Sequence, residues 1–293
     1  MISPQKALKM LRRRSAKGLG QHFLIHQATA EKIVAAIQPG PGDVVVEIGA
    51  GLGALTLPLS KSGALVIAVE IDAELAMFLG NELGKEKGKG VKIECMDILE
   101  LDLIGLYEQF QRKIKIIGNV PYNISSPILF KLMGAAACLE AAVLMLQDEV
   151  AARILAGPGT KDYGILSVVA AYHSELRRVM RLKSSQFHPP PKVDSQVIHV
   201  QFRECPLTPR VEPFWLLQTV KAAFSHRRKT LRNSLLASKL GNLTPNLVST
   251  ALEKASIEPQ RRPESLTLVE FLRLAEALKE RKGTKLVDEE IYP

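Results

Sequence analysis

The sequence predicts an α/β fold, in which a mostly parallel sheet is covered on both faces by helices and is followed by a smaller all-helical domain. Two observations predict it. Short apolar runs alternate with helical patterns up to about residue 205, and only helical patterns follow. Strands that alternate with helices are joined by right-handed crossovers and are therefore parallel. The 293 residues, 46% of them hydrophobic, suffice for two cores. We place the domains at residues 1–205 and 206–293.

Five apolar runs, each about as long as a strand, define the predicted parallel strands. They lie at residues 43–48, 65–70, 91–95, 114–118 and 141–147. Amphipathic patterns typical of helices precede the first run and separate several of the others. These helical patterns lie at residues 27–37, 52–61, 72–83 and 126–133.

The pattern changes after the fifth strand. Helical patterns at 148–155 and 163–173 are followed by two runs, 176–182 and 196–202, that alternate in the manner of antiparallel strands. The segment between these runs contains Pro189, Pro190 and Pro191, and proline cannot continue a helix because it lacks the amide hydrogen. The C-terminal domain is predicted to contain four helices, at residues 213–224, 229–240, 245–255 and 267–281.

The net charge of +9 is distributed unevenly. Residues 1–20 carry six basic and no acidic side chains, residues 21–204 carry 18 and 20, and residues 205–293 carry 15 and 10. A nearly neutral body between two basic ends predicts a small-molecule or catalytic site in the body and ends that bind a polyanion such as nucleic acid. Basic ends that serve only solubility are the alternative.

Cysteine spacing and hydropathy indicate a soluble, cytoplasmic protein. Cys95, Cys138 and Cys205 form no CxxC pair, so neither a disulfide framework nor a structural zinc site is predicted. No apolar stretch follows the arginines near the N-terminus, which excludes a signal peptide. The longest apolar run, 135–146, is interrupted by Glu140 and is too short to span a membrane.

The first strand ends in a glycine-rich turn, Glu47-Ile48-Gly49-Ala50-Gly51-Leu52-Gly53, directly before a helix. Glycines at such a turn let the backbone approach a ligand, and the helix N-terminus offers free amides. The second strand ends in Glu70, where an acid can accept hydrogen bonds from both hydroxyls of a ribose. Because Gly49-x-Gly51-x-x-Ala54 also fits the dinucleotide fingerprint, this loop leaves both NAD and S-adenosylmethionine open.

The next two strands also end in polar residues. Asp97 follows the third strand, where it could meet an adenine amine, and Asn119-Val120-Pro121-Tyr122 follows the fourth, where a substrate would lie. Taken singly, Asp97 reads equally well as a helix N-cap and Asn119 as a turn former. Their coincidence with Glu70 at matching strand ends favours a binding site.

These motifs resemble the ribosomal RNA adenine dimethyltransferases. Asn119-Val120-Pro121-Tyr122 looks like the amino-methyltransferase signature, and the 47–53 turn is similar to the S-adenosylmethionine loop of that superfamily. The resemblance covers residues 15–280 and is greatest to the bacterial small-subunit enzymes associated with kasugamycin sensitivity. His22 stands where the family more often has asparagine, and Val120 where it has leucine. The narrower family motifs are similar to Gly20-Gln21-His22-Phe23-Leu24 and to residues 159–164, 187–195 and 224–233.

The resemblance implies a Rossmann-like class I methyltransferase sheet with an antiparallel strand. It implies S-adenosylmethionine as the cofactor and dimethylation of the exocyclic N6 amine of two adjacent adenosines near the 3′ end of small-subunit ribosomal RNA. Ribosomal RNA or the immature small subunit is then the partner, and the protein is expected to act as a monomer. No metal is expected, because the thioether that leaves the sulfonium is neutral.

The resemblance also implies site residues. Asn119, through its side-chain oxygen, and the backbone carbonyl of Val120 or Pro121 would accept hydrogen bonds from the target amine. Tyr122 and Phe187 would stack on the two faces of the flipped base. Asn119, Pro121, Tyr122 and Phe187 are therefore the predicted catalytic residues. The predicted cofactor contacts are Gln21, His22, Leu24, Gly49, Gly51, Glu70, Asp97, Ile98 and Asn119.

Basic residues predict the RNA contacts. Arg227, Arg228, Lys229 and Arg232 fall at the expected start of a helix, with Arg228 and Arg232 four residues apart on one face. A second contact is expected at Arg12, Arg13, Arg14 and Lys17. With only 5% aromatic residues, the chain favours folded RNA read by its shape over a single strand.

Four alternatives stay open at this stage. A large-subunit RNA adenine methyltransferase of the macrolide-resistance type shares the loop and the Asn119–Tyr122 element, and a DNA adenine methyltransferase would share the chemistry. A ribosome-assembly factor would dock without depending on catalysis. An NAD-dependent oxidoreductase is disfavoured, because no proton-relay residue lies near the fourth strand end.

Overall fold

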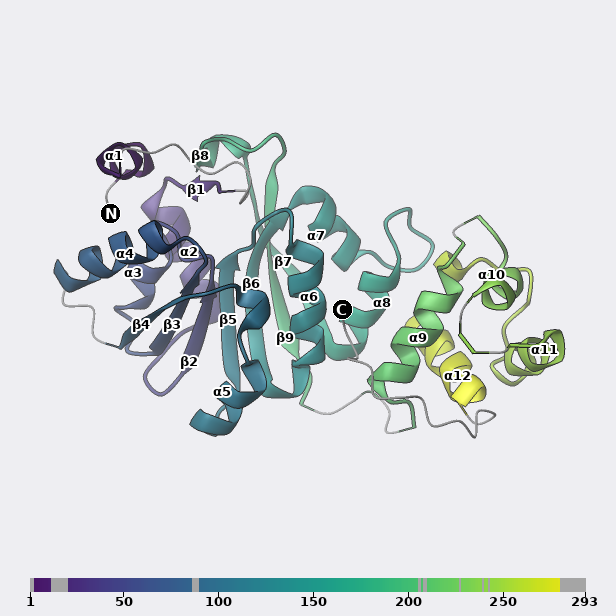
Figure 1. Cartoon of the computed structure of the whole chain (residues 1–293). Coiled ribbons are helices and arrows are strands. Elements are labelled where there is room, and N and C mark those ends of the chain that lie inside the picture. The colour runs from purple at the N-terminus through teal and green to yellow at the C-terminus, as the bar shows by residue number, and fades with distance from the viewer. Residues whose placement is uncertain are drawn as a thin grey trace. The chain divides into compact units, whose positions relative to one another are not determined.

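The computed structural model in Figure 1 describes residues 3–11, 21–85, 90–204, 207, 210–226, 228–238, 240–241 and 243–279. The chain forms two compact units. The first comprises Met1–Ala151 and Ser174–Glu204, and the second comprises Ala152–His173 and Cys205–Pro293. All residues after 204 belong to the second unit, so this boundary agrees with the one predicted after residue 205 to within one residue. Residues 152–173, which the sequence predicts to lie in the first domain, belong to the second unit.

Seven strands form the main sheet of the first unit, in the order β4-β3-β2-β5-β6-β9-β7. β2 pairs in parallel with β3 and β5, and β4 and β6 continue the parallel part. β9 is antiparallel to both of its neighbours, β6 and β7. The predicted mostly parallel sheet with an antiparallel strand is therefore confirmed. The strands are β2 (Val44–Ile48), β3 (Leu65–Glu70), β4 (Val91–Cys95), β5 (Ile114–Asn119), β6 (Leu139–Gln147), β7 (Ser174–Leu182) and β9 (Ser195–Phe202).

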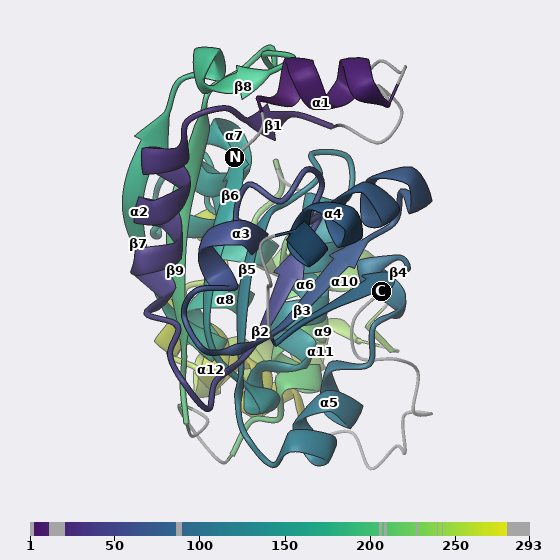
Figure 2. The ribbon, with the colours of Figure 1, turned by 90° about the vertical axis from the view of Figure 1, so that its left-hand side faces the viewer.

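Helices cover both faces of this sheet (Figure 2). The central strand β2 is buried over all five residues, as a strand covered on both sides must be. α2, α3 and α4 contribute apolar side chains that pack on one face, against residues such as Val45, Val66 and Ala68. α5 and α6 follow β4 and β5 and lie on the other face. The bounds are α2 (Gln27–Ile37), α3 (Thr56–Leu59), α4 (Ala73–Lys85), α5 (Leu103–Phe110), α6 (Ser125–Gly134) and α7 (Asp148–Leu155).

Two short strands, β1 (Phe23–Leu24) and β8 (Phe187–His188), pair with each other in an antiparallel manner. This pairing joins the N-terminal motif to the proline-rich segment, although more than 160 residues separate them in sequence. The N-terminal helix α1 (Pro4–Met10) packs nearby. Its buried residues Ala7 and Leu8 belong to an apolar cluster with Phe23, which is the first residue of β1.

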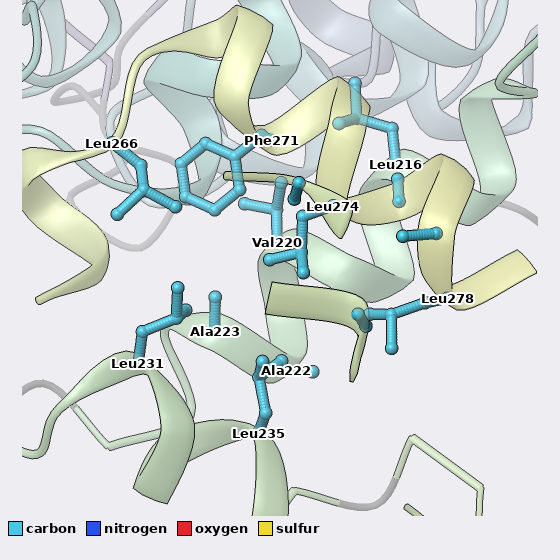
Figure 3. Close-up of a cluster of buried hydrophobic side chains, with 14 of the residues drawn as sticks. Leu216, Val220, Ala222, Ala223, Leu231, Leu235, Leu266, Phe271, Leu274 and Leu278 are labelled. Carbon is cyan, nitrogen blue, oxygen red and sulfur yellow. The ribbon is translucent and has the colours of Figure 1, made fainter. Parts of the chain in front are cut away.

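The second unit is helical. Its helices share one apolar core, part of which Figure 3 shows, and Phe271 is completely buried within it. α8 belongs to this unit because Val168 and Tyr172 lie in the same core and the Tyr172 hydroxyl donates a hydrogen bond to the Val211 carbonyl at 3.0 Å. The helices are α8 (Ile165–His173), α9 (Pro213–Ala223), α10 (Leu231–Ala237), α11 (Pro245–Lys254) and α12 (Leu268–Lys279).

Two further features concern the length and apolar character of the helices and the state of the cysteines. Among the helices of the described residues, none combines the length and the apolar character needed to cross a bilayer. Cys95 and Cys138 are free thiols, whereas Cys205 lies outside the described residues.

We predict that Phe271→Ala destabilises the second unit by about 3–5 kcal/mol, because the substitution leaves a cavity in a core that cannot close around it. Urea unfolding of the whole chain, followed by circular dichroism, measures the loss. Val269→Ala on the same helix is the matched control. Since Val269 is 63% exposed, it is expected to change stability by less than about 0.5 kcal/mol. Equal effects of the two substitutions would contradict the assignment of this core.

Candidate active site

A cavity lies at the carboxyl ends of the parallel strands of the first unit. Apolar side chains and backbone line most of it, and a few polar side chains converge on it, as is typical of small-molecule sites. Its walls come from β1 and from the residues at or just after the ends of β2, β3, β4 and β5. All nine residues predicted to contact a cofactor line it, namely Gln21, His22, Leu24, Gly49, Gly51, Glu70, Asp97, Ile98 and Asn119.

The glycine-rich turn after β2 forms one wall. Gly49 and Gly51 have φ angles of 67° and 54°, in the left-handed region that favours glycine. A Cβ atom on Gly51 would lie 3.2 Å from the ring of Phe23, and one on Gly49 would lie 3.3 Å from the carbonyl oxygen of Asn119. Side chains at these positions would therefore strain the turn and crowd the neighbouring walls.

Glu70 holds the turn in place. One of its carboxylate oxygens accepts a hydrogen bond from the Gly51 amide at 2.8 Å, and the other accepts one from the Asp72 amide at 3.0 Å. Burial raises the pKa of Glu70, and these two backbone hydrogen bonds oppose that rise. The carboxylate is thus oriented by the backbone of the chain before any ligand is present.

Glu47 is the second buried acid of the cavity wall. It is only 1% exposed, and one of its carboxylate oxygens has no hydrogen-bond partner among the described residues. Burial raises the pKa of Glu47 to about 8. Desolvation of this buried carboxyl therefore favours its neutral form.

Asp97 serves two purposes. It lines the cavity, and one of its oxygens accepts a hydrogen bond from the Leu99 amide at 2.9 Å, which caps a short 3₁₀ helix at Ile98–Glu100. The interpretation of Asp97 as an N-cap is therefore correct and compatible with a ligand contact, because only one of the two carboxylate oxygens is used in this bond.

Asn119, the last residue of β5, is oriented by the N-terminal motif. Its side-chain nitrogen donates a hydrogen bond to the backbone carbonyl of His22 at 2.7 Å. This bond identifies the nitrogen end of the amide, so the side-chain oxygen is the end that can accept from a ligand. Within the described part of the chain, no hydrogen bond uses that oxygen.

The structure also distinguishes the Val120 carbonyl from the Pro121 carbonyl as the backbone acceptor for a target amine. The Pro121 carbonyl accepts a hydrogen bond from the Ile124 amide at 3.2 Å within the turn that follows β5. The Val120 amide is held by the Met145 carbonyl at 3.1 Å, and among the described residues no backbone group donates to the Val120 carbonyl. Val120 rather than Pro121 therefore offers the acceptor beside Asn119.

The sequence matches the family model described as ribosomal RNA adenine dimethylase over residues 12–280. The chain belongs to this family. It is 43% identical to the ribosomal RNA small subunit methyltransferase A of Desulforapulum autotrophicum, over 98% of this chain and 100% of that protein. These matches cover both structural units.

Solved structures of similar proteins agree with this assignment. A dimethyladenosine transferase from Plasmodium falciparum is 26% identical and superimposes with a TM-score of 0.74, covering 86% of this chain and 96% of that one. The 23S rRNA methyltransferase ErmE is also 26% identical, with a TM-score of 0.65 over 88% of this chain and 99% of that one. The predicted Rossmann-like class I methyltransferase fold is thereby confirmed.

The two aromatic residues expected in the dimethylase site lie in different surroundings. Tyr122 is partly exposed and its hydroxyl is hydrogen bonded to Ser195, a contact that sequence patterns did not reveal. Phe187 is only 2% exposed, because β8 pairs with β1 and turns the ring into the apolar core beneath α2. Neither ring is among the side chains that line the cavity, and the stacking of Tyr122 and Phe187 on a flipped base stays a prediction.

The predicted RNA contacts lie in the second unit. Arg228 and Lys229 are exposed, and Arg232 is partly exposed on α10. α10 begins only at Leu231, because Thr230 caps it by accepting a hydrogen bond from the Asn233 amide. The expected helical face shared by Arg228 and Arg232 is therefore wrong. Arg227 lies outside the described residues, as do Arg12, Arg13, Arg14 and Lys17.

A second basic segment, Arg261-Arg262, lies beside this region. It was not among the RNA contacts predicted from the sequence. The Leu231 amide donates a hydrogen bond to the Arg261 carbonyl at 2.7 Å, which brings the exposed Arg262 to the start of α10. The Arg261-Arg262 pair is visible in the sequence, but only the folded chain places it beside α10. Among the described residues, no group of three His, Cys, Asp or Glu side chains is arranged to hold a metal ion.

We predict that stability depends on pH through Glu47. Its pKa is about 8 in the folded chain, whereas an unfolded chain releases this proton near the ordinary value of about 4.3. Between these values the folded state keeps a proton that the unfolded state has lost. The stability contributed by neutral Glu47 is therefore complete at low pH and is lost as the pH rises through about 8.

Thermal unfolding at about pH 5.5 and pH 8.5, without added ligand, tests this prediction. The Tm of Glu47→Gln is expected to fall less between these two pH values than the Tm of the wild type. The difference is expected to be about 2–4 °C for each kcal/mol that ionisation of Glu47 costs the folded wild type. Glu100→Gln, which changes an exposed carboxylate, is the control and is expected to follow the wild type. Parallel curves for the wild type and Glu47→Gln would contradict the prediction.

Proposed function

We propose that the protein transfers methyl groups from S-adenosylmethionine to the exocyclic N6 amine of adenosines in small-subunit ribosomal RNA. It dimethylates two adjacent adenosines near the 3′ end of that RNA during ribosome biogenesis. The observation that carries this proposal is the convergence of Glu70, Asp97 and Asn119 on one cavity, in a chain of the ribosomal RNA adenine dimethylase family. The 43% identity to a small-subunit methyltransferase over nearly the whole chain supports the choice of RNA.

The cavity fits the proposed cofactor. When bound, S-adenosylmethionine supplies a methyl group activated on a positively charged sulfur. Glu70, already oriented by two amides, receives the ribose hydroxyls. The free oxygen of Asp97 would accept a hydrogen bond from the adenine amine. Gln21, His22, Leu24, Gly49, Gly51 and Ile98 complete the contacts.

Asn119 and Val120 prepare the target amine. The lone pair of an adenine amine is delocalised into the ring, so the amine is a weak nucleophile. Acceptance of its two hydrogens by the Asn119 side-chain oxygen and the Val120 carbonyl concentrates electron density on nitrogen. The same contacts stabilise the positive charge that develops as the methyl group arrives. Tyr122 stacks on the flipped base and aligns it.

The basic residues of the second unit bind RNA phosphates. Arg228, Lys229 and Arg232 supply the contacts predicted from the sequence, and Arg262 extends the surface beside α10. Such contacts position the substrate but do not read its sequence. We also propose that the protein acts as a monomer in the cytoplasm, where this RNA is found, since one chain supplies every wall of the cavity.

Methylation of a large-subunit RNA is the alternative favoured by a specific observation, the likeness to ErmE. The test uses labelled S-adenosylmethionine with unmodified small-subunit particles, large-subunit RNA and duplex DNA, each digested to nucleosides. We expect dimethyladenosine from the small-subunit particles alone. Product from the large-subunit RNA or the DNA alone would reassign the substrate. Cofactor binding without transfer to any of them would support a docking role and overturn the proposal.

We predict that Asn119→Ala lowers kcat by about 10²–10³-fold while cofactor affinity stays within about threefold, because Asn119 stabilises charge that appears only during transfer. Glu70→Ala is the contrasting variant. It is expected to weaken cofactor binding at least about tenfold, since a charged hydrogen-bond acceptor is lost. Calorimetry with the cofactor and single-turnover methylation separate the two effects. Near wild-type turnover of Asn119→Ala would refute the role of its side chain.

A further inference from the structure

We propose that Ser195 and His22 are positioning residues that hold the ring of Tyr122 as a fixed stacking surface for one face of the target base. The inference rests on the proposed function, because it concerns the base that the enzyme methylates. Ser195 holds the ring by its hydroxyl and His22 packs against the ring.

Ser195 is a rigid anchor. Its hydroxyl lies 2.7 Å from the Tyr122 hydroxyl, and the residue is completely buried. It begins β9 and is paired on one side with Gln147 of β6 and on the other with Leu182 of β7. Because both neighbouring strands hold its backbone, Ser195 fixes the far end of the Tyr122 ring to the sheet.

His22 supports the ring from the side. The centroids of the His22 and Tyr122 rings are 5.3 Å apart, with an angle of 32° between their planes. The Nδ1 atom of His22 lies 2.7 Å from the Pro189 carbonyl, which can only accept, so Nδ1 is the ring nitrogen that donates a hydrogen bond to that oxygen. The backbone carbonyl of His22 holds the Asn119 side chain. One residue thus contacts both functional side chains of the Asn119–Tyr122 motif.

The His22 and Tyr122 rings are too close together for a base to enter between them. A base between two rings would require about 7 Å between them, which is two stacking distances. The ring centroids lie only 5.3 Å apart. The base therefore approaches Tyr122 from a side that His22 does not cover.

His22 is also the point at which this chain departs from the resemblance, since asparagine is more common there. An asparagine would keep the backbone carbonyl that binds Asn119 but would provide no ring to pack on Tyr122. The variant His22→Asn therefore removes the support of Tyr122 and leaves the bond to Asn119 intact.

A double-mutant cycle tests the Ser195 anchor. Tyr122→Phe and Ser195→Ala each remove the same hydrogen bond, so each is expected to lower kcat about tenfold, and the double variant no further. Cofactor affinity is expected to stay within about twofold in all three. The exposed Ser185→Ala is the matched control and is expected to behave as the wild type. Tyr122→Phe leaves Ser195 in place, so it keeps the test valid if Ser195→Ala does not fold.

Fluorescence of an RNA carrying 2-aminopurine at the target position reports stacking directly. Binding by the wild type is expected to quench it, and the quench is expected to weaken in Tyr122→Phe, Ser195→Ala and His22→Asn, with a loss of about 2–10-fold in turnover for the last. Rescue is expected in His22→Phe, which restores a ring. Additive losses in the cycle, or an unchanged quench in Ser195→Ala and His22→Asn, would overturn the inference.

The two proposals fail in different ways. Absence of methyl transfer by the wild type on every substrate would refute the proposed function. Normal wild-type transfer, together with full kcat and full quench in Ser195→Ala and His22→Asn, would refute only the positioning roles.

Discussion

The parallel register of β2, β3, β4 and β5 is the constraint on which the site depends. Parallel strands end at the same edge of a sheet, so residues as much as seventy positions apart in sequence meet there. The turn at Gly49–Gly51, the acid Glu70 and the amide Asn119 each come directly from a strand end. Asp97 comes from the loop after β4. The chemistry of the cavity is thus distributed over four strands, and the sheet brings it together.

That arrangement places two carboxylates, Glu47 and Glu70, in one buried wall, where desolvation opposes their charge. The chain resolves this conflict differently at each position. Glu70 receives two backbone amides, which stabilise its charge and the glycine turn together. Glu47 keeps an oxygen without a partner and a pKa near 8, so it lowers the stability of the free protein at alkaline pH.

Local patterns predicted the parts of the structure that local physics determines. The strand ends, the glycine turn, Glu70, Asp97 and Asn119 followed from runs of apolar residues and the polar residues after them. The cavity residues Gln21, His22, Leu24 and Ile98 were implied only by the family resemblance. Long-range packing decided the rest. Apolar periodicity predicted a helix at 163–173 but not that Val168 and Tyr172 serve the second core. The burial of Phe187 depends on its pairing with β1, and the hydroxyl contact of Tyr122 depends on the start of β9. The late start of α10 was the one local signal overlooked, since Thr230 is a good N-cap.

The pairing of β1 with β8 gives the N-terminal motif its importance. Through this pairing, His22 connects two parts of the site. His22 lines the cavity, its backbone carbonyl accepts a hydrogen bond from Asn119, and its ring packs against Tyr122. The N-terminal motif therefore contacts both the acceptor for the target amine and the ring expected to stack on the target base. Methyl transfer needs donor and acceptor aligned within a fraction of an ångström. A backbone segment shared by both halves of the site provides that alignment more reliably than two separate loops would.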